Sequence, residues 1–152
     1  MALIESCVGK LTPEQVWARS SANQNAVGNL LLHLTGNVRQ WILHGVGGQP
    51  DHRNRDAEFA ARDGTDAREM LSSLRAALDQ AVALCHSLPR ERLPEKIQFQ
   101  GYDVTVLAAI YHVVEHFAGH TFQIIYATKQ FTGEDLAFHP DPSKTRGGHG
   151  SQ

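Results

Sequence analysis

The sequence predicts an all-α fold, an antiparallel four-helix bundle with a short extended element before the last helix. Apolar residues recur at helical spacing through three long segments, and glycine or proline closes each segment. A chain of 152 residues can bury a proper core without extra cross-links. We expect the bundle to occupy residues 1–138, and a flexible tail rich in Pro, Gly and charged residues to occupy 139–152.

The N-terminal half begins with two short segments. Residues 2–8 form a short first element that ends at Gly9. Residues 12–15 (TPEQ) combine a cap, a proline at the first helical position and a capping-box glutamine, which predicts a helix to about residue 19. A longer helix follows over about 26–44, where apolar residues form a core-facing stripe before glycines and a proline end it.

The C-terminal half contains two more long helices. The charged stretch 49–63 is expected to be a surface connection with one turn of helix around Glu58. A helix starts from a cap at residue 65 or 66 and ends near residue 87, before a proline. Residues 96–104 alternate in polarity, which predicts an extended element or hairpin across one end of the bundle. The most apolar helix follows over about 105–129.

The composition argues against several classes of partner. The net charge is −2 and Lys and Arg are scattered, so we expect neither nucleic acid nor a membrane surface as partner. No apolar run approaches the roughly 20 residues that span a bilayer, and no signal-peptide pattern opens the chain. Cys7 and Cys85 lack CxxC spacing and are expected to be small buried hydrophobes rather than a disulfide or a catalytic thiol. These features predict a cytoplasmic protein.

The last helix carries three histidines one helical turn apart, His112, His116 and His120. Residues four apart share one face of a helix, and neutral imidazole is a good ligand for transition metals. His116 and His120 therefore have the spacing at which one helix offers two nitrogens to a single ion. Glu115 precedes this pair instead of lying within it, which excludes the His-Glu-x-x-His protease motif.

A metal site needs a further ligand from a separate element, and His33 is the candidate. It lies in the apolar run NLLLHL of the helix over 26–44, where an unpaired imidazole would be costly to bury. Taken alone, such a histidine is more often a core residue that bonds a backbone carbonyl. The histidine pair on a neighbouring helix favours a metal ligand.

Three residues near this site have roles that the sequence leaves open. His112 could be a fourth ligand, an acid or base in a pocket, or a hydrogen-bond donor to Glu115 or to the backbone. Asn37, one turn after His33, could line the site or hold a water, and could equally pack helices together. Glu115 could orient a ligand histidine through its second nitrogen, or could form an exposed salt bridge.

The sequence resembles the DinB-like superfamily, which consists of four-helix bundles with a three-histidine metal site. The segments that carry the resemblance are NLLLHLTGN (29–37), RQW (39–41), RNRDAEF (53–59) and HFAGHTFQI (116–124). The resemblance covers about residues 11–138. It implies one histidine from the second helix and a pair from the fourth, which at matching positions are His33, His116 and His120.

The chain departs from the family pattern in two places. Members commonly carry His-x-Gly-Gln after the histidine pair, whereas this chain has Phe122 at the glycine position. The bulky side chain is expected to narrow a pocket beside the site or to alter a dimer contact. Members also open with a longer first helix than residues 2–8 provide, so the first element is incomplete or displaced.

The resemblance implies a metal-binding protein, and we expect a metal-dependent, hydrolase-type enzyme of unknown substrate. Three histidines leave open positions for water, whose pKa a bound ion lowers. A thiol-dependent S-transferase of the same fold and a non-catalytic stress or sensor module are the alternatives. The expected cofactor is a divalent transition metal, with Zn or Ni ahead of Fe, Mn and Cu. The expected partners are a small-molecule substrate and, from the resemblance, a second copy in a homodimer.

Overall fold

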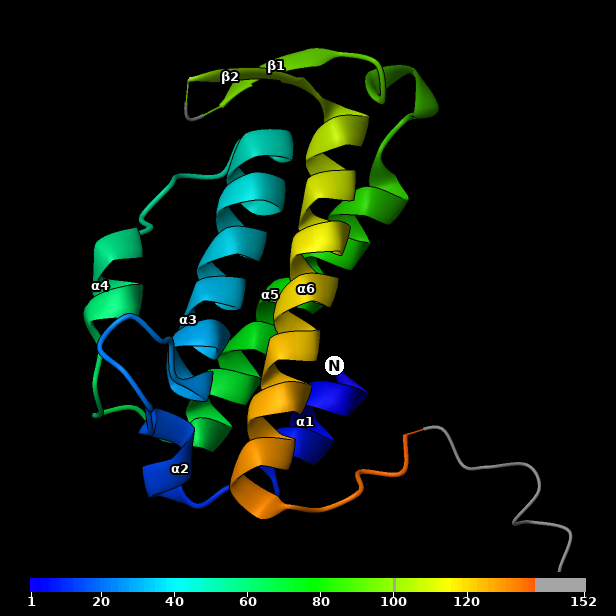
Figure 1. Ribbon diagram of the computed structural model, residues 1–152. Coiled ribbons are helices and arrows are strands. Elements are labelled where there is room, and N and C mark those ends of the chain that lie inside the picture. Colours follow the sequence, from blue (N-terminus) through cyan, green and yellow to red (C-terminus); the bar gives the residue numbers. More distant parts are fainter. Residues whose placement is uncertain (100, 139–152) are drawn as a thin grey trace, which may run out of the picture.

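Long helices dominate the computed structural model, which describes residues 1–99 and 101–138 (Figure 1). Its elements in chain order are α1 (Ala2–Val8), α2 (Pro13–Trp17), α3 (Val27–Val38), η1 (Arg39–Val46), α4 (Arg55–Ala60), α5 (Ala67–Ser87), η2 (Arg90–Arg92), β1 (Lys96–Phe99), β2 (Tyr102–Thr105) and α6 (Val106–Thr132). The mostly helical fold predicted from the sequence is confirmed, with a small two-stranded sheet added to it. No helix in this part of the chain is long and apolar enough to cross a membrane. The predicted tail over 139–152 lies outside the described residues.

The helices begin and end at residues whose side chains or backbone suit the position. The Thr12 hydroxyl accepts a hydrogen bond from the backbone of Gln15, whose side chain accepts one from the Thr12 backbone in return. At the start of α5 the Asp66 side chain accepts a hydrogen bond from the Arg68 backbone, and at the start of α6 the Thr105 side chain accepts one from the Ala108 backbone. Gly133 ends α6 with a φ of 67°, a left-handed conformation that favours glycine.

The helices α3 and α5 run side by side in the same direction, and α6 runs opposite to both (Figure 1). One apolar cluster joins the start of α3 to Met70 near the start of α5 and to Ile124 in the second half of α6. A second cluster joins η1 to Ala81 and to Val106, at the other ends of these helices. The fully antiparallel order predicted from the sequence is therefore wrong for α3 and α5. The reason is the connection between them, which is long enough to return along the bundle.

This connection packs against α3 instead of lying free on the surface. Asn29 of α3 donates hydrogen bonds from Nδ2 to the backbone carbonyls of Glu58 and Ala61, at 2.8 and 3.0 Å. The predicted turn of helix is present as α4, but the prediction of an exposed connection is wrong for Glu58, which is 9% exposed. The docking of this connection places the charged side chains of Glu58 and Arg53 against the middle of α3.

The strands β1 and β2 form an antiparallel hairpin across one end of the bundle, as predicted (Figure 1). Gly101 has a φ of 79° in the turn, which is a left-handed conformation that glycine adopts readily. At the same end α3 continues into η1, a π-helical segment of the kind that is frequent at functional sites. The hairpin and η1 together supply Tyr102, Val104 and Trp41 to a cleft between α3 and α6.

Candidate metal centre

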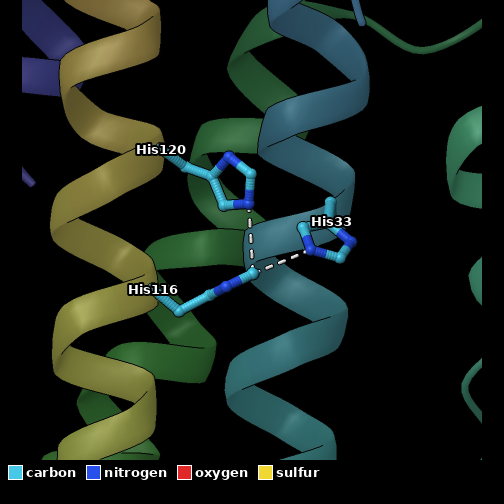
Figure 2. A group of neighbouring side chains, drawn as sticks. All are labelled: His33, His116 and His120. Atoms are coloured by element: carbon cyan, nitrogen blue, oxygen red, sulfur yellow. Dashed lines mark hydrogen bonds between the residues drawn. The ribbon is translucent and has the colours of Figure 1, made fainter.

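Three imidazole rings from two neighbouring helices point toward one another (Figure 2). His33 projects from α3, and His116 and His120 project from consecutive turns of α6. Nε2 of His116 lies 2.8 Å from Nε2 of His33 and 3.1 Å from Nε2 of His120. One ligand atom from each ring lies within 4.8 Å of the others, so the group could hold a metal ion. The structure thus brings together the three histidines that the sequence selects.

A buried carboxylate sets the orientation of His33. Nδ1 of His33 lies 3.0 Å from Oε2 of Glu58. Because an ionised carboxylate can only accept, Nδ1 carries the ring proton and Nε2 presents its lone pair to the other histidines. Burial would raise the pKa of Glu58, but hydrogen bonds and charge from Arg53 and His33 together lower it. Glu58 is therefore an ionised acceptor at neutral pH.

Arg53 fixes the Glu58 carboxylate with two hydrogen bonds. Its Nε donates to Oε1 at 2.7 Å and its Nη2 donates to Oε2 at 2.8 Å, an arrangement typical of strong Arg–carboxylate pairs. Nη1 donates to Oε1 of Gln40 at 2.7 Å, and Gln40 in turn donates to Asp51. Nη2 also lies 3.0 Å from Nδ1 of His33, since both groups donate to the same carboxylate oxygen. The Arg53 and Glu58 side chains are 5% and 10% exposed, so the protein encloses this ion pair almost completely.

Gln123 orients His120 in a similar way. Oε1 of Gln123 lies 2.7 Å from Nδ1 of His120. An amide oxygen can only accept, so with this assignment Nδ1 carries the proton and Nε2 faces the other two rings. Glu58 and Gln123 therefore each accept the Nδ1 proton of one candidate ligand and fix the orientation of its ring. Metal-bound histidines usually have such a hydrogen-bond partner.

The hydrogen-bonding pattern of the cluster fits a bound cation. Nε2 of His33 and Nε2 of His120 both present lone pairs toward Nε2 of His116, which carries at most one proton to donate. One of the three nitrogens is therefore left without a donor. The three nitrogens would each offer a lone pair to a divalent cation once the ring proton of His116 is on Nδ1, and an all-imidazole set suits Zn, Ni, Cu or Fe.

The surroundings of His116 and His120 also favour the neutral form of these two rings. Burial, reinforced by the neighbouring charges of His120, His33, His112 and Arg53, lowers the pKa of His116 to about 4. Burial likewise lowers the pKa of His120, although its hydrogen bond to Gln123 acts in the opposite direction. Neutral imidazole is the form that binds metals. These two rings are ready to bind at neutral pH without losing a proton.

The depressed pKa of His116 predicts that the metal-free protein loses stability as the pH falls. The unfolded chain protonates this residue near the ordinary value of 6.5, whereas the folded chain does so near 4. The two states differ in bound protons between these values, so the free energy of unfolding decreases as the pH falls from 6.5 toward 4. Urea midpoints at neutral and mildly acidic pH measure this decrease. It should be smaller in His116→Gln, and an equal decrease in both proteins would refute the assignment.

The structure gives different surroundings to His112, Asn37 and Glu115, whose roles the sequence leaves open. The His112 ring lies with its centroid 4.1 Å from that of Trp41 and 5.4 Å from that of His116, and it is not part of the ligand group. Asn37 is buried and lines the same cleft as His112. Glu115 is exposed and does not line that cleft. Burial lowers the pKa of His112, and the charge of Glu115 opposes this.

A cleft of about 430 Å³ opens beside the histidine cluster. His33 and His116 line it on one side, and Trp41, His112 and Tyr102 add aromatic surface. Among the described residues, no acidic side chain lines it. The cleft is therefore a route by which a small molecule can reach the histidines.

Phe122 and the two cysteines lie away from this cleft. Phe122 is 69% exposed on α6 and does not line this cleft, but it lines a second pocket together with Gln123, the residue that orients His120. Cys7 is buried as predicted, and Cys85 is half-buried. Burial raises the pKa of both thiols, so neither has the thiolate character of a catalytic cysteine.

Sequence reasoning did not identify Glu58, Arg53 and Gln123 as parts of the site. The available signal was a row of polar residues on an otherwise apolar helix: Asn29, His33, Asn37 and Gln40, at spacings of three and four. Such a row requires a polar partner when it is buried. The charged stretch after the helix supplies that partner to Asn29, His33 and Gln40.

Gly36 leaves room for the Glu58–Arg53 pair against α3. A Cβ at this position would lie 2.0 Å from Oε1 of Glu58 and 2.8 Å from Nε of Arg53. Because both side chains are buried and paired, they cannot move aside freely. We expect Gly36→Ala to weaken metal binding and to lower the free energy of unfolding by about 1–3 kcal/mol, although alanine ordinarily stabilises a helix.

Gly119 of α6 provides the matched control. A Cβ there would meet nothing within 4 Å. We expect Gly119→Ala to stabilise the protein by up to about 1 kcal/mol and to leave metal binding unchanged. Urea unfolding and metal titration compare the two variants, and the same result for both would show that the Glu58–Arg53 pair does not support the site.

Comparison with known proteins places the chain in a family. Residues 1–140 match the family described as "Protein of unknown function (DUF1572)". A conserved protein from Enterococcus faecalis has a similar structure, with a TM-score of 0.73 at 14% identity over 88% of this chain and 91% of that chain. A DinB-like protein from Bacillus subtilis gives a TM-score of 0.67 at 14% identity over 90% of each chain. No curated protein matches the sequence. The chain belongs to the DUF1572 family, and its fold is similar to that of a DinB-like protein.

Proposed function

We propose that His33, His116 and His120 bind one divalent transition metal, with Zn or Ni as first candidates, and that the protein is a hydrolase-type metalloenzyme. The observation that carries this proposal is the convergence of three Nε2 atoms beside a cleft. A tetrahedral ion with three protein ligands keeps a position open for water or substrate. The bound ion would supply Lewis acidity and lower the pKa of a water toward neutrality.

His112 is the residue that we propose as the proton acceptor. It lines the cleft one turn from His116, and burial lowers its pKa, so that it is a neutral base at pH 7. Its contact with Trp41 holds the ring beside the cleft. We expect His112→Gln to retain the metal and to lose most of the hydrolytic rate, about 10²–10⁴-fold for the loss of a general base.

The experiment that tests the function uses protein loaded with a single metal. It is assayed against chromogenic esters and amides, and separately against small thiols with an electrophile. Hydrolysis that requires both the metal and His112 supports the proposal. Metal-dependent thiol consumption without hydrolysis supports the S-transferase. Bound metal with neither activity favours a stress or sensor module.

We further propose that α1, α3, α5 and α6 form a DinB-type four-helix bundle, and that the protein is a cytoplasmic homodimer. Four large apolar side chains of α6 support the dimer: Tyr111, Val114, Phe122 and Tyr126, which are 61–69% exposed. Such a row is typical of an interface. Sedimentation of the parent and of Phe122→Glu tests it, with a dimer expected for the parent and a monomer for the variant.

A further inference from the structure

A buried polar atom of a residue that lines the cleft lacks a partner. Asn37 of α3 is 3% exposed, and among the described residues its Oδ1 accepts no hydrogen bond. The residue lines the cleft beside His33 and His116. A buried amide oxygen without a donor destabilises the folded protein. Its presence therefore suggests a donor that arrives with a ligand.

A second asparagine on the same helix shows what a structural role looks like. Asn29 lies two turns before Asn37 and is fully buried. Its Oδ1 accepts hydrogen bonds from Arg19 and from the Ala26 backbone, and its Nδ2 donates to two carbonyls of the connection. Asn29 thus holds α4 and the chain before α3 in place, whereas Asn37 has no comparable set of bonds.

The rest of the cleft has a positive charge and aromatic walls. The guanidinium of Arg55 lies 4.9 Å from the centroid of the Phe59 ring and forms no ion pair with a described residue. Arg53 also lines the cleft, but Glu58 neutralises it. Since no acidic side chain of the described residues lines this space, Arg55 gives it a net positive charge that favours an anion.

We propose that this cleft binds a small organic anion that carries a hydroxyl or amino group, with Oδ1 of Asn37 accepting that hydrogen bond. Arg55 pairs with the anionic group, and the Trp41–His112 surface contacts the apolar part of the ligand. The inference deepens the proposed function, since it names the substrate class of the same site. Asn37 is a positioning residue in this account.

The melting temperature distinguishes a ligand-binding role of Asn37 from a role in helix packing. Leucine has nearly the same shape as asparagine but no group that needs a partner. We expect Asn37→Leu to raise the melting temperature by about 2–4 °C, and Asn29→Leu to lower it, because its four hydrogen bonds are lost. A decrease in both variants would mean that Asn37 packs helices and would overturn the inference.

Ligand binding is measured through the fluorescence of Trp41 in a Trp17→Phe background, since the chain has two tryptophans. The probes are mandelate, phenylacetate, which lacks the hydroxyl group, and benzyl alcohol, which lacks the carboxylate. We expect mandelate to bind about 3- to 10-fold more tightly than phenylacetate, as one added hydrogen bond allows. Asn37→Ala should bring this ratio to about one. Arg55→Gln should weaken both acids and leave benzyl alcohol unchanged.

The same titrations on metal-free protein keep the inference separate from the proposed function. Asn37 and Arg55 are not metal ligands, so the preference for mandelate should persist without metal. If the protein takes up no metal at all and still prefers mandelate, the result supports the binding cleft and contradicts the metal site. Equal binding of the two acids by the parent, or a ratio that Asn37→Ala leaves unchanged, would overturn the inference even if the metal is bound.

Discussion

Replacing His116 by alanine is expected to reduce bound metal from about one equivalent to nearly none. Its Nε2 lies between those of His33 and His120, so its removal leaves two nitrogens for the ion. The alanine variants of His33 and His120 should show the same loss. The measurement is elemental analysis of proteins purified without a metal-affinity column.

Two other histidines serve as controls for this experiment. His112 shares the helix face but not the ligand group, and His86 is exposed at the end of α5. Alanine variants of both should keep the metal of the parent. Circular dichroism should show that all five variants remain helical, because two apolar clusters hold the fold apart from the site. Undiminished metal in His116→Ala would show that the ligands are misassigned.

Glu58→Gln is expected to have the second largest effect, although Glu58 is not one of the three proposed ligands. The change removes the charged acceptor of the His33 Nδ1 proton, and loss of such a partner typically weakens a metal site by about 10–100-fold. It also leaves Arg53 buried without its counter-charge, which should cost about 3–5 kcal/mol of stability. Chelator competition measures the first effect and urea unfolding measures the second.

Glu115→Gln is the matched control for this change. It makes the same substitution on an exposed glutamate beside a ligand, and we expect neither affinity nor stability to change. If both variants weaken the metal equally, a general loss of negative charge explains the effect and the specific role of Glu58 is wrong. Metal affinity that survives Glu58→Gln unchanged would contradict that role as well.

The three-histidine cluster could be predicted because its evidence is local. The spacing of His116 and His120 places both on one helix face whatever surrounds that helix. His33 stands out as a polar residue in an apolar run, and its partner had to come from another long helix. The helix boundaries were predictable for the same reason, as the caps at Asp66 and Thr105 depend on residues three or fewer positions away.

Glu58 and Arg53, which orient His33, could not be predicted because their contacts are not local. Glu58 reaches His33 only after α4 docks on α3 through the Asn29 hydrogen bonds. A charged stretch between two helices is ordinarily exposed, and nothing in its own sequence shows which face covers it. The parallel direction of α3 and α5 has the same origin, since the path of the connection depends on this docking.

X-ray absorption at the metal edge of protein purified without a metal-affinity column is the most direct test of the central claim. The account predicts one equivalent of a first-row transition metal, with three imidazole nitrogens at about 2.0–2.1 Å if the metal is Zn. The His116→Ala variant should lose this shell of nitrogens. Protein that contains no metal and takes none up on reconstitution, or a metal bound without imidazole, would contradict the claim that His33, His116 and His120 form a metal site.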